Sequence, residues 1–439
     1  MEYISERRHS LKRYGQLVRL PDTLTDEKIA ETTPGVCQTD KGFKCIQCGT
    51  TERFHFYCYK SPFFKEDIIY CRNCIAMGRM DTKRHVVITQ TKRMKSDGYY
   101  QLPFSLSEQQ TYASRKIVSA VESKQPLLLH AVTGAGKTEM MFEAISVARQ
   151  KGDNIAIVSP RVDVVVEVSQ RVCQTFTREE IDILHQSSRQ KYNGHFVIAT
   201  VHQLYRFKNH FDVIFIDEVD AFPLSMDRQL QQTIARAARA THACIYMTAT
   251  PPKPLMRSFH ATQIITLPAR FHRHPLVVPE FRYMKIKYSQ AQHSLISELK
   301  NQMNRQRTTL LFFSNIENMK RFYSAYRTTF KNMCYVYSED ADRLEKVQQL
   351  RNGMYQIVLT TTILERGFTM AFLDVWVMDS HHFTADALVQ IAGRVGRKQE
   401  SPNGLVRFYH EGRTLAMYKA RRNIRQMNRM AYLKGWVDY

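Results

Sequence analysis

Residues 131–138 read Ala-Val-Thr-Gly-Ala-Gly-Lys-Thr, and this stretch indicates the fold of the chain more directly than any other. It follows a short apolar run at 126–130 and precedes a segment, 139–149, in which apolar residues recur at helical spacing. A loop of small residues between a buried strand and the start of a helix presents backbone N–H groups that attract phosphate. The stretch therefore predicts a phosphate-binding loop in an α/β domain.

Individual residues of this loop suit a bound nucleoside triphosphate. Gly134 and Gly136 allow close approach of the backbone, Lys137 can reach the β- and γ-phosphates, and the hydroxyl at position 138 can hold Mg²⁺. Ala131 stands where the pattern G-x-x-x-x-G-K-[ST] has its first glycine. The predicted nucleotide contacts of the loop are Thr133, Gly134, Ala135, Gly136, Lys137 and Thr138.

A second apolar run ends in carboxylates about 80 residues after Lys137, where 211–220 reads Phe-Asp-Val-Ile-Phe-Ile-Asp-Glu-Val-Asp. Asp217 can position Mg²⁺ through water, and Glu218 can orient the water that attacks the γ-phosphate. Two acids after an apolar strand usually belong to a solvated loop. Their distance from the phosphate loop favours a second strand of the same nucleotide site.

The length and charge of the chain limit the possible classes of protein. With 439 residues the chain is too long for one core, so two or three domains are expected. The 63 Lys and Arg residues outnumber 41 Asp and Glu, and the net charge of +22 predicts a polyanionic partner such as nucleic acid or an anionic membrane surface. We find no apolar run of membrane-spanning length and no secretory signal, which predicts a cytosolic protein with reduced thiols.

Apolar runs alternate with helical stretches in two successive regions, which predicts two α/β domains with parallel, doubly wound sheets. We place them at 104–270 and at 285–439, the latter ending in a basic helix, with a proline-containing linker at 271–284. A polar lead-in, 1–36, and a cysteine-rich module with a basic β segment, 37–103, precede them. The predicted strands are 127–129, 155–158, 196–199, 213–216, 243–247, 309–313, 333–337, 356–360, 375–378 and 405–409.

Two C-x-x-C pairs, Cys45–Cys48 and Cys71–Cys74, lie in the module, separated by 22 residues. Each pair can supply two corners of a tetrahedral Zn²⁺ site. No open coordination position is implied, so we interpret the zinc as structural. Cys37 and Cys58 stay open as additional or alternative ligands, whereas His55 is interpreted as a surface histidine.

The order of motifs between 104 and about 400 resembles that of superfamily 2 DNA helicases and translocases with two RecA-like domains. Residues 106–110, Leu-Ser-Glu-Gln-Gln, resemble the glutamine motif, which implies that Gln109 contacts adenine. Residues 390–397, Gln-Ile-Ala-Gly-Arg-Val-Gly-Arg, resemble motif VI, which implies that Arg394 and Arg397 are arginine fingers. The other matches are motif Ia at 159–161, Ib at 199–203, II at 217–220, III at 247–250, IV at 311–315 and V at 360–367.

The same resemblance extends to nucleic-acid contacts and to one further nucleotide contact, Gly367 in motif V. Superfamily 2 motors hold a strand mostly through its phosphates, which suits binding without sequence preference. Motif II reads Asp-Glu-Val-Asp, which puts a strict RNA-helicase assignment in doubt. The implied DNA contacts are Arg161, His202, Thr250, Thr362 and Arg366. Aromatic residues beside the cysteine pairs can either stack on bases or form a small core around the zinc; they are Phe54, Phe56, Tyr57 and Tyr59.

A four-cysteine module followed by a basic β segment and a compact motor resembles one family, the ComFA late competence proteins, through residues 70–79 and 131–138. The resemblance implies a DNA-dependent ATPase that uses ATP, Mg²⁺ and Zn²⁺ and drives incoming single-stranded DNA into the cytosol during natural transformation. It also implies the channel protein ComEC and the phosphoribosyltransferase-like ComFC as partners, at the inner face of the cell membrane. Self-association and peripheral membrane attachment stay open.

Two other functions are compatible with these motifs. One is a replication-restart helicase resembling PriA, which places its zinc module between the motor halves, whereas here the cysteines precede the motor. The other is a zinc-containing nucleic-acid-binding scaffold with an inactive motor. The presence of Lys137, Glu218, Arg394 and Arg397 argues against the scaffold.

Overall fold

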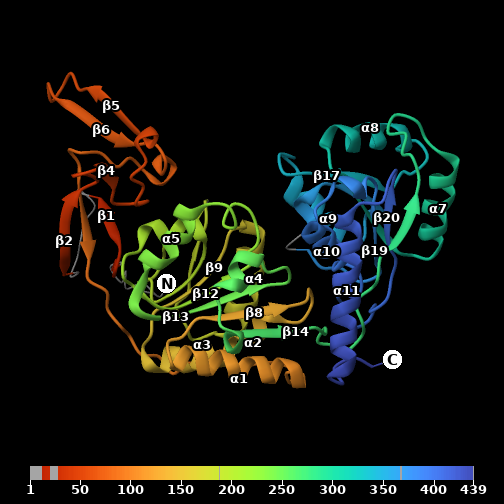
Figure 1. Cartoon of the computed structure of the whole chain (residues 1–439), viewed down its shortest axis with the longest axis horizontal. Coiled ribbons are helices and arrows are strands. Elements are labelled where there is room, and N and C mark those ends of the chain that lie inside the picture. Colours follow the sequence, from red (N-terminus) through yellow and green to blue (C-terminus); the bar gives the residue numbers. More distant parts are fainter. Residues whose placement is uncertain (1–11, 20–27, 187, 366–367, 439) are drawn as a thin grey trace, which may run out of the picture. The chain divides into compact units, whose positions relative to one another are not determined.

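The computed structural model describes residues 12–19, 28–186, 188–365 and 368–438 (Figure 1). The chain divides into two compact units. The first contains the residues up to 105, together with 114–129 and 140–264, and the second contains 106–113, 130–139 and the residues from 265 onward. Within the described part of the chain, no helix has the length and apolar character needed to cross a membrane.

A seven-stranded sheet carries the first half of the predicted motor. Its strands are β8 (Leu127–Ala131), β9 (Ile155–Ser159), β10 (Asp182–Leu184), β11 (Phe196–Thr200), β12 (Phe211–Asp217), β13 (Ala238–Thr248) and β14 (Ile264–Leu267). They lie in the order β10-β11-β9-β12-β13-β8-β14. The strands from β10 to β13 in this order run parallel, and every residue of β9, β11 and β12 is buried. Parallel strands covered on both faces need continuous apolar runs, which explains why the sequence reveals them.

The helices around this sheet connect its strands. They are α1 (Glu108–Glu122), α2 (Lys137–Met140), α3 (Phe142–Lys151), α4 (Val162–Thr175), α5 (Arg228–Ala237) and α6 (Lys253–Arg257), with short 3-10 helices η3 (Val201–Arg206) and η4 (Ala261–Gln263). The helix α4 packs four of its valines inward, because Val164, Val165, Val168 and Val172 recur at helical spacing and are buried.

The second unit contains a six-stranded sheet in the order β15-β20-β19-β16-β18-β17, and all of its neighbouring strands are parallel. The strands are β15 (Glu280–Tyr283), β16 (Thr308–Phe312), β17 (Met333–Val336), β18 (Ile357–Thr360), β19 (Leu373–Val377) and β20 (Val406–His410). The helices are α7 (His293–Asn304), α8 (Ile316–Tyr326), α9 (Arg343–Arg351), α10 (Ala385–Ala392) and α11 (Leu415–Leu433), with η5 (Thr362–Glu365) and η6 (Ser380–His382). The α/β fold class is thereby confirmed, as are the ten predicted strands and the basic C-terminal helix, α11.

Three strands of these sheets are not evident in the sequence. They are β10, β14 and β15, and each lies at the edge of its sheet. Edge strands are short and need to bury only part of their surface, so they lack the long apolar runs that identify central strands.

The N-terminal module is built from antiparallel strands. A three-stranded sheet has the order β1 (Leu17–Arg19), β7 (His85–Thr89), β2 (Ile29–Pro34). Two hairpins follow β2. The first consists of β3 (Val36–Thr39) and β4 (Gly42–Cys45), and the second of β5 (Phe56–Lys60) and β6 (Asp67–Cys71). The 3-10 helix η1 (Arg53–His55) lies between the hairpins, and η2 (Ile75–Met77) follows the second. The segment read as a polar lead-in thus supplies β1 and β2. Most residues of β2 are exposed, which explains its polar sequence.

The module and the first sheet share one hydrophobic core. Buried residues of the module, including Val36, Met80 and Val86, belong to the same cluster as Leu204 and Phe207 of the motor. The module therefore folds as part of the first unit, which includes residues up to 105.

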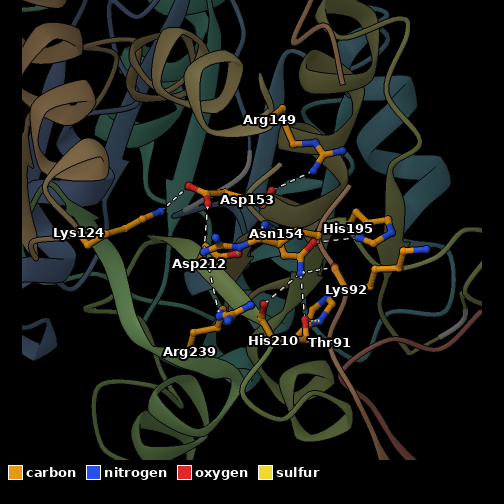
Figure 2. Close-up of polar contacts among 11 residues, drawn as sticks. Thr91, Lys92, Lys124, Arg149, Asp153, Asn154, His195, His210, Asp212 and Arg239 are labelled. Atoms are coloured by element: carbon orange, nitrogen blue, oxygen red, sulfur yellow. Dashed lines mark hydrogen bonds and ion pairs between the residues drawn. The ribbon is translucent and has the colours of Figure 1, made fainter. Parts of the chain in front are cut away.

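The segment after β7 is fastened to the amino ends of β9 and β12 by buried polar groups (Figure 2). Asn154 donates from Nδ2 to the Thr91 hydroxyl at 3.2 Å and to the Lys92 carbonyl at 3.0 Å. The Asp212 carboxylate is completely buried, accepts a hydrogen bond from the Asn154 amide at 3.0 Å and forms an ion pair with Arg93. These contacts join the module to the base of the sheet.

Two buried histidines complete this polar group (Figure 2). His210 lies 2.9 Å through Nε2 from the Gly194 carbonyl and 2.8 Å through Nδ1 from the Thr91 hydroxyl. Because a carbonyl only accepts, Nε2 carries the proton and Nδ1 accepts from the hydroxyl. Burial lowers the pKa of both His210 and His195 to about 4, so both rings are neutral near pH 7.

Candidate functional site

The predicted phosphate loop lies between β8 and α2. Gly134 and Gly136 have φ angles of +83° and +78°, which favour glycine. A Cβ at Gly136 would lie 2.2 Å from the Gln110 side-chain nitrogen. That nitrogen donates to the Ala135 carbonyl at 3.1 Å, so Gln110 of α1 stabilises the loop through a side-chain hydrogen bond. Sequence reasoning missed this role, although Gln110 lies in the recognised glutamine motif.

Gln109, the predicted adenine contact, is only 2% exposed. Its Nε2 donates to the carbonyls of Ala269 and Arg270, each at 2.9 Å. Its Oε1 is buried and accepts no hydrogen bond from the part of the chain that the structure describes. An amide oxygen in this position can accept a hydrogen bond from an amino group such as that of adenine.

The predicted carboxylates lie at the end of β12, all of whose residues are buried. Asp217 accepts a hydrogen bond through Oδ1 from the Glu218 amide at 2.9 Å. Glu218 has a φ of +55°, in the left-handed region that non-glycine residues rarely adopt. Backbone strain of this kind persists only where the surroundings fix it, and it concentrates at functional sites. In sheet order only β13 separates β12 from β8, the strand that precedes the phosphate loop.

A third carboxylate connects motif II to motif III. Asp220 accepts hydrogen bonds from the hydroxyls of Thr248 at 2.5 Å and Thr250 at 2.6 Å. The Thr250 amide also donates to the Thr248 hydroxyl at 3.0 Å. The turn that carries Asp217 and Glu218 is therefore tied to the end of β13. Sequence reasoning did not give Asp220 this role, because its partners lie 28 and 30 residues away.

The predicted arginine fingers follow α10 in the second unit. Arg394 is 1% exposed, and its guanidinium donates to the Phe368 carbonyl. Arg397 is partly exposed and donates from Nε to the Gly393 carbonyl at 2.9 Å and from Nη1 to the Thr369 hydroxyl at 3.4 Å. Both side chains thus lie against residues 368–369. The predicted nucleotide contact Gly367 lies outside the described residues.

The predicted DNA contacts lie on separate elements. Arg161 precedes α4 and His202 lies on η3, and both are partly buried. Thr250 is 6% exposed with its hydroxyl on Asp220. Thr362 begins η5 and is exposed, and Arg366 lies outside the described residues.

The four cysteines of the two C-x-x-C pairs come together as predicted. Their sulfur atoms lie within 4.8 Å of one another, and all four residues are buried. The Sγ–Sγ distances are 3.5 Å for Cys45–Cys74, 3.7 Å for Cys48–Cys71 and 3.9 Å for Cys71–Cys74. A tetrahedron with Zn–S bonds of about 2.3 Å has edges of about 3.8 Å, so the donor set fits Zn²⁺.

The residues left open as alternative ligands lie elsewhere. Cys37 contacts the Thr33 hydroxyl at 3.1 Å, and Cys58 is exposed on β5. His55 faces Glu52 at 3.7 Å. None of Cys37, Cys58 and His55 belongs to the four-cysteine group found among the described residues.

Two cations of the motor lie beside the cysteine cluster. Lys208 donates from Nζ to the Gln47 carbonyl at 3.1 Å. Arg236, on α5, approaches Gly49 so closely that a Cβ there would lie 1.3 Å from its Nη1. Four thiolates and one Zn²⁺ carry a net charge of about −2, which these cations offset. Sequence reasoning missed both, since they are more than 130 positions away from the cysteines.

A phosphate loop, an Asp-Glu motif and motif VI on two RecA-like sheets define a superfamily 2 helicase or translocase ATPase. Three family models match the chain: the type III restriction enzyme res subunit at residues 103–253, the helicase conserved C-terminal domain at 290–399, and the competence protein ComFA N-terminal domain at 14–88. The last match falls on the module with the four cysteines.

Two curated relatives match nearly the whole chain. The chain is 35% identical over 403 residues to competence protein ComFA of Bacillus subtilis (strain 168), covering 89% of this chain and 86% of the relative. It is 32% identical over 429 residues to competence protein ComFA of Streptococcus pneumoniae (strain ATCC BAA-255 / R6), covering 93% of this chain and 96% of the relative. The chain belongs to the ComFA family of competence proteins.

Solved structures confirm the fold. RecG bound to a three-way DNA junction aligns with a TM-score of 0.54 at 17% identity over 76% of this chain, which spans only 47% of the RecG chain. Saccharomyces cerevisiae Dbp5 bound to RNA and ADP BeF3 aligns with a TM-score of 0.53 at 12% identity, covering 74% of this chain and 92% of Dbp5. The DEAD-box helicase Mss116 bound to ssRNA and UDP-BeF aligns with a TM-score of 0.56 at 15% identity, covering 69% of each chain.

Proposed function

We propose that this chain is an ATP-driven translocase that pulls incoming single-stranded DNA into the cytosol during natural transformation. Membership of the ComFA family supports the biological role. The observation that carries the motor proposal is the link from Asp220 to Thr248 and Thr250. It connects the carboxylate turn to the segment that resembles motif III, which couples hydrolysis to strand contacts in motors of this class.

Each residue of the nucleotide site has a proposed task. Lys137 contacts the β- and γ-phosphates, and Glu218 orients the attacking water. Thr138 and Asp217, the latter through water, would position Mg²⁺, which would supply positive charge to neutralise the phosphates. Gln109 offers its buried Oε1 to the adenine amino group. The proposed nucleotide contacts also include Thr133, Gly134, Ala135, Gly136 and Gly367.

Arg394 and Arg397 are the proposed arginine fingers, which stabilise charge in the transition state. Arg397 is the more accessible of the two. Arg394 is almost fully buried, and its guanidinium donates a hydrogen bond to the Phe368 carbonyl. A motor whose fingers belong to the second RecA-like domain hydrolyses ATP only when the domains close, and this dependence converts hydrolysis into movement along a strand.

The proposed strand contacts are Arg161, His202, Thr250, Thr362 and Arg366. Single-stranded DNA is the proposed substrate, and the net charge of +22 favours any polyanion. ComEC and ComFC are the proposed partners, at the inner face of the cell membrane, on the strength of the family resemblance. The Zn²⁺ held by the four cysteines is proposed to stabilise the module.

ATP hydrolysis with and without single-stranded DNA tests this function, with duplex DNA and Glu218→Gln as controls. We expect strong stimulation by single strands, weak stimulation by duplex, and none in Glu218→Gln. Displacement of streptavidin from 3′- or 5′-biotinylated oligonucleotides then reports directional movement. Hydrolysis that ignores DNA would favour the scaffold with an inactive motor, and unwinding of forked duplexes would favour the PriA-like helicase.

A further inference from the structure

The β5–β6 hairpin divides its side chains between two faces. The antiparallel register pairs Tyr57 with Tyr70 and Tyr59 with Ile68, so the three tyrosines share one face. Phe56 is on the opposite face and packs against the hydrophobic core of the first unit. Strand alternation therefore places Phe56 on the core side of β5 and the three tyrosines on the other face, which also carries the buried Ile68. In Figure 1 the hairpin forms the far end of the N-terminal module.

Arginines flank the three tyrosines. The ring centroids of Tyr57 and Tyr59 lie 5.6 Å and 6.1 Å from that of Tyr70. The Arg79 guanidinium lies 4.9 Å from the Tyr70 centroid and 5.1 Å from the Tyr59 centroid, and Asp81 holds it at 2.9 Å. Arginine–aromatic contacts at these distances are favourable and fix the rings in place.

Phe54 is connected to this row through Arg72, and its ring contacts that of His55 at 4.1 Å between centroids. It lies on η1, next to β5, and its carbonyl accepts a hydrogen bond from the Arg72 guanidinium at 2.9 Å. The same guanidinium lies 5.9 Å from the Tyr57 centroid. Phe54 is 66% exposed and Tyr57 is 49% exposed. Packing within the module explains the positions of Tyr59 and Tyr70 but leaves these two rings facing solvent.

We propose that this row is a binding surface for single-stranded nucleic acid, distinct from the strand contacts of the motor. We name it the tyrosine platform and define it as Phe54, Tyr57, Tyr59, Tyr70, Arg72 and Arg79. Exposed rings with interspersed guanidinium groups match the two repeating parts of a single strand, since bases stack on rings and phosphates contact cations. A duplex keeps its bases stacked on one another, so the platform selects single strands.

The proposal rests on the proposed function, because the strand that the platform holds is the one that the motor moves. The platform belongs to a module whose core is continuous with that of the motor. A strand on the platform is therefore held on the same compact unit that carries Asp217 and Glu218. This arrangement retains DNA during the part of the ATP cycle in which the motor contacts are weak.

The test measures binding of the full chain to fluorescent oligo-dT by anisotropy, without nucleotide. Loss of one stacking base lowers affinity by about 5-fold or more, so Tyr57→Leu is expected to bind at least about 5-fold more weakly. Tyr57→Phe keeps the ring and should bind like the wild type. Tyr283→Leu removes a ring that is 72% exposed in the second unit and serves as the matched control. Zinc content and thermal unfolding of each variant establish that the module is folded.

Two further ligands separate stacking from charge. An abasic oligonucleotide offers phosphates without bases, so Tyr57→Leu should leave its affinity unchanged. Arg72→Gln should weaken binding to both oligonucleotides and reduce the slope of log K against log salt by about 0.7, the value for one phosphate contact on a single strand.

Unchanged oligo-dT affinity in Tyr57→Leu, with DNA-stimulated ATP hydrolysis intact, would overturn the platform and leave the motor function standing. If Tyr57→Leu instead binds oligo-dT like the wild type but loses binding to anionic lipid vesicles, the platform would also be overturned. That result would assign this face to the membrane. Absence of both strand binding and stimulation in the wild-type chain would overturn the motor function itself, and the platform with it.

Discussion

Replacement of Asp220 by alanine should uncouple ATP hydrolysis from DNA binding, so that bound DNA no longer stimulates hydrolysis. The substitution removes the acceptor of two short hydrogen bonds, from Thr248 at 2.5 Å and from Thr250 at 2.6 Å. Both threonines are almost fully buried, so water cannot readily replace the carboxylate. A hydrogen bond to a charged group contributes about 1.5–3 kcal/mol. The two bonds share one carboxylate and are not additive, so we expect a loss of about 2–4 kcal/mol in the free energy of unfolding of the first unit.

The functional effect should exceed what lower stability explains. Asp220→Ala is expected to retain nucleotide binding and basal hydrolysis but to lose most of the stimulation by single-stranded DNA. Asp227→Ala is the matched control, because Asp227 caps α5 by accepting from the amides of Gln229 and Leu230 at 2.9 Å and 3.0 Å. Loss of this cap costs about 1 kcal/mol and should leave DNA stimulation unchanged.

A double-mutant cycle with Thr250→Val measures the interaction directly. We expect a coupling energy of about 1.5–3 kcal/mol from denaturant unfolding of the two single variants and the double variant. Additive losses of stability, or normal DNA stimulation in Asp220→Ala, would refute the argument that this carboxylate transmits the state of the nucleotide site.

Three further predictions concern the metal, the buried histidines and the phosphate loop. Cys71→Ser should release zinc and lower the melting temperature by at least about 5 °C, because the cluster lies in the shared core, whereas exposed Cys58→Ser should change neither. The pKa values of His195 and His210 are lowered to about 4, so the free energy of unfolding should be highest above pH 6.5 and fall by about 1 kcal/mol per histidine at pH 5.5; a curve that is flat over this range in denaturant unfolding would contradict their neutral burial. Gly136→Ala should weaken binding of a fluorescent ATP analogue by at least about 10-fold, because its Cβ would strike Gln110 in addition to the strain at positive φ. Gly353 has a similar φ of +75°, and a Cβ added there would meet no atom of the described residues within 4 Å, so Gly353→Ala should leave ATP affinity unchanged.

The features predicted from sequence share a local signal. The phosphate loop, the carboxylates after β12 and the two C-x-x-C pairs are each contained in a few consecutive residues. Ten strands of the two sheets are visible in the sequence because parallel strands that are covered on both faces are largely apolar, whereas β10, β14 and β15 at the sheet edges are not. The strands β1 and β2 leave no such trace, since β2 is largely exposed and is ordered by its pairing with β7.

The features that sequence reasoning missed depend on contacts between distant segments. Asp220 meets Thr248 and Thr250 only because β12 and β13 are neighbours in the sheet. Lys208 and Arg236 reach the cysteine cluster only because the module packs against the motor. Neither arrangement has a spacing or composition that a single sequence reveals.

The fastening of residues 91–93 to the sheet also has a mechanical consequence. Tension in a DNA strand bound to the N-terminal module would exert a force on the module. Asn154 and Asp212 would transmit this force to the amino ends of β9 and β12. Several hydrogen bonds and ion pairs on one short segment share that force, together with the apolar surface beneath the module. The module is therefore expected to move together with the first sheet. A DNA strand bound to the module would then be displaced by the same distance as the sheet.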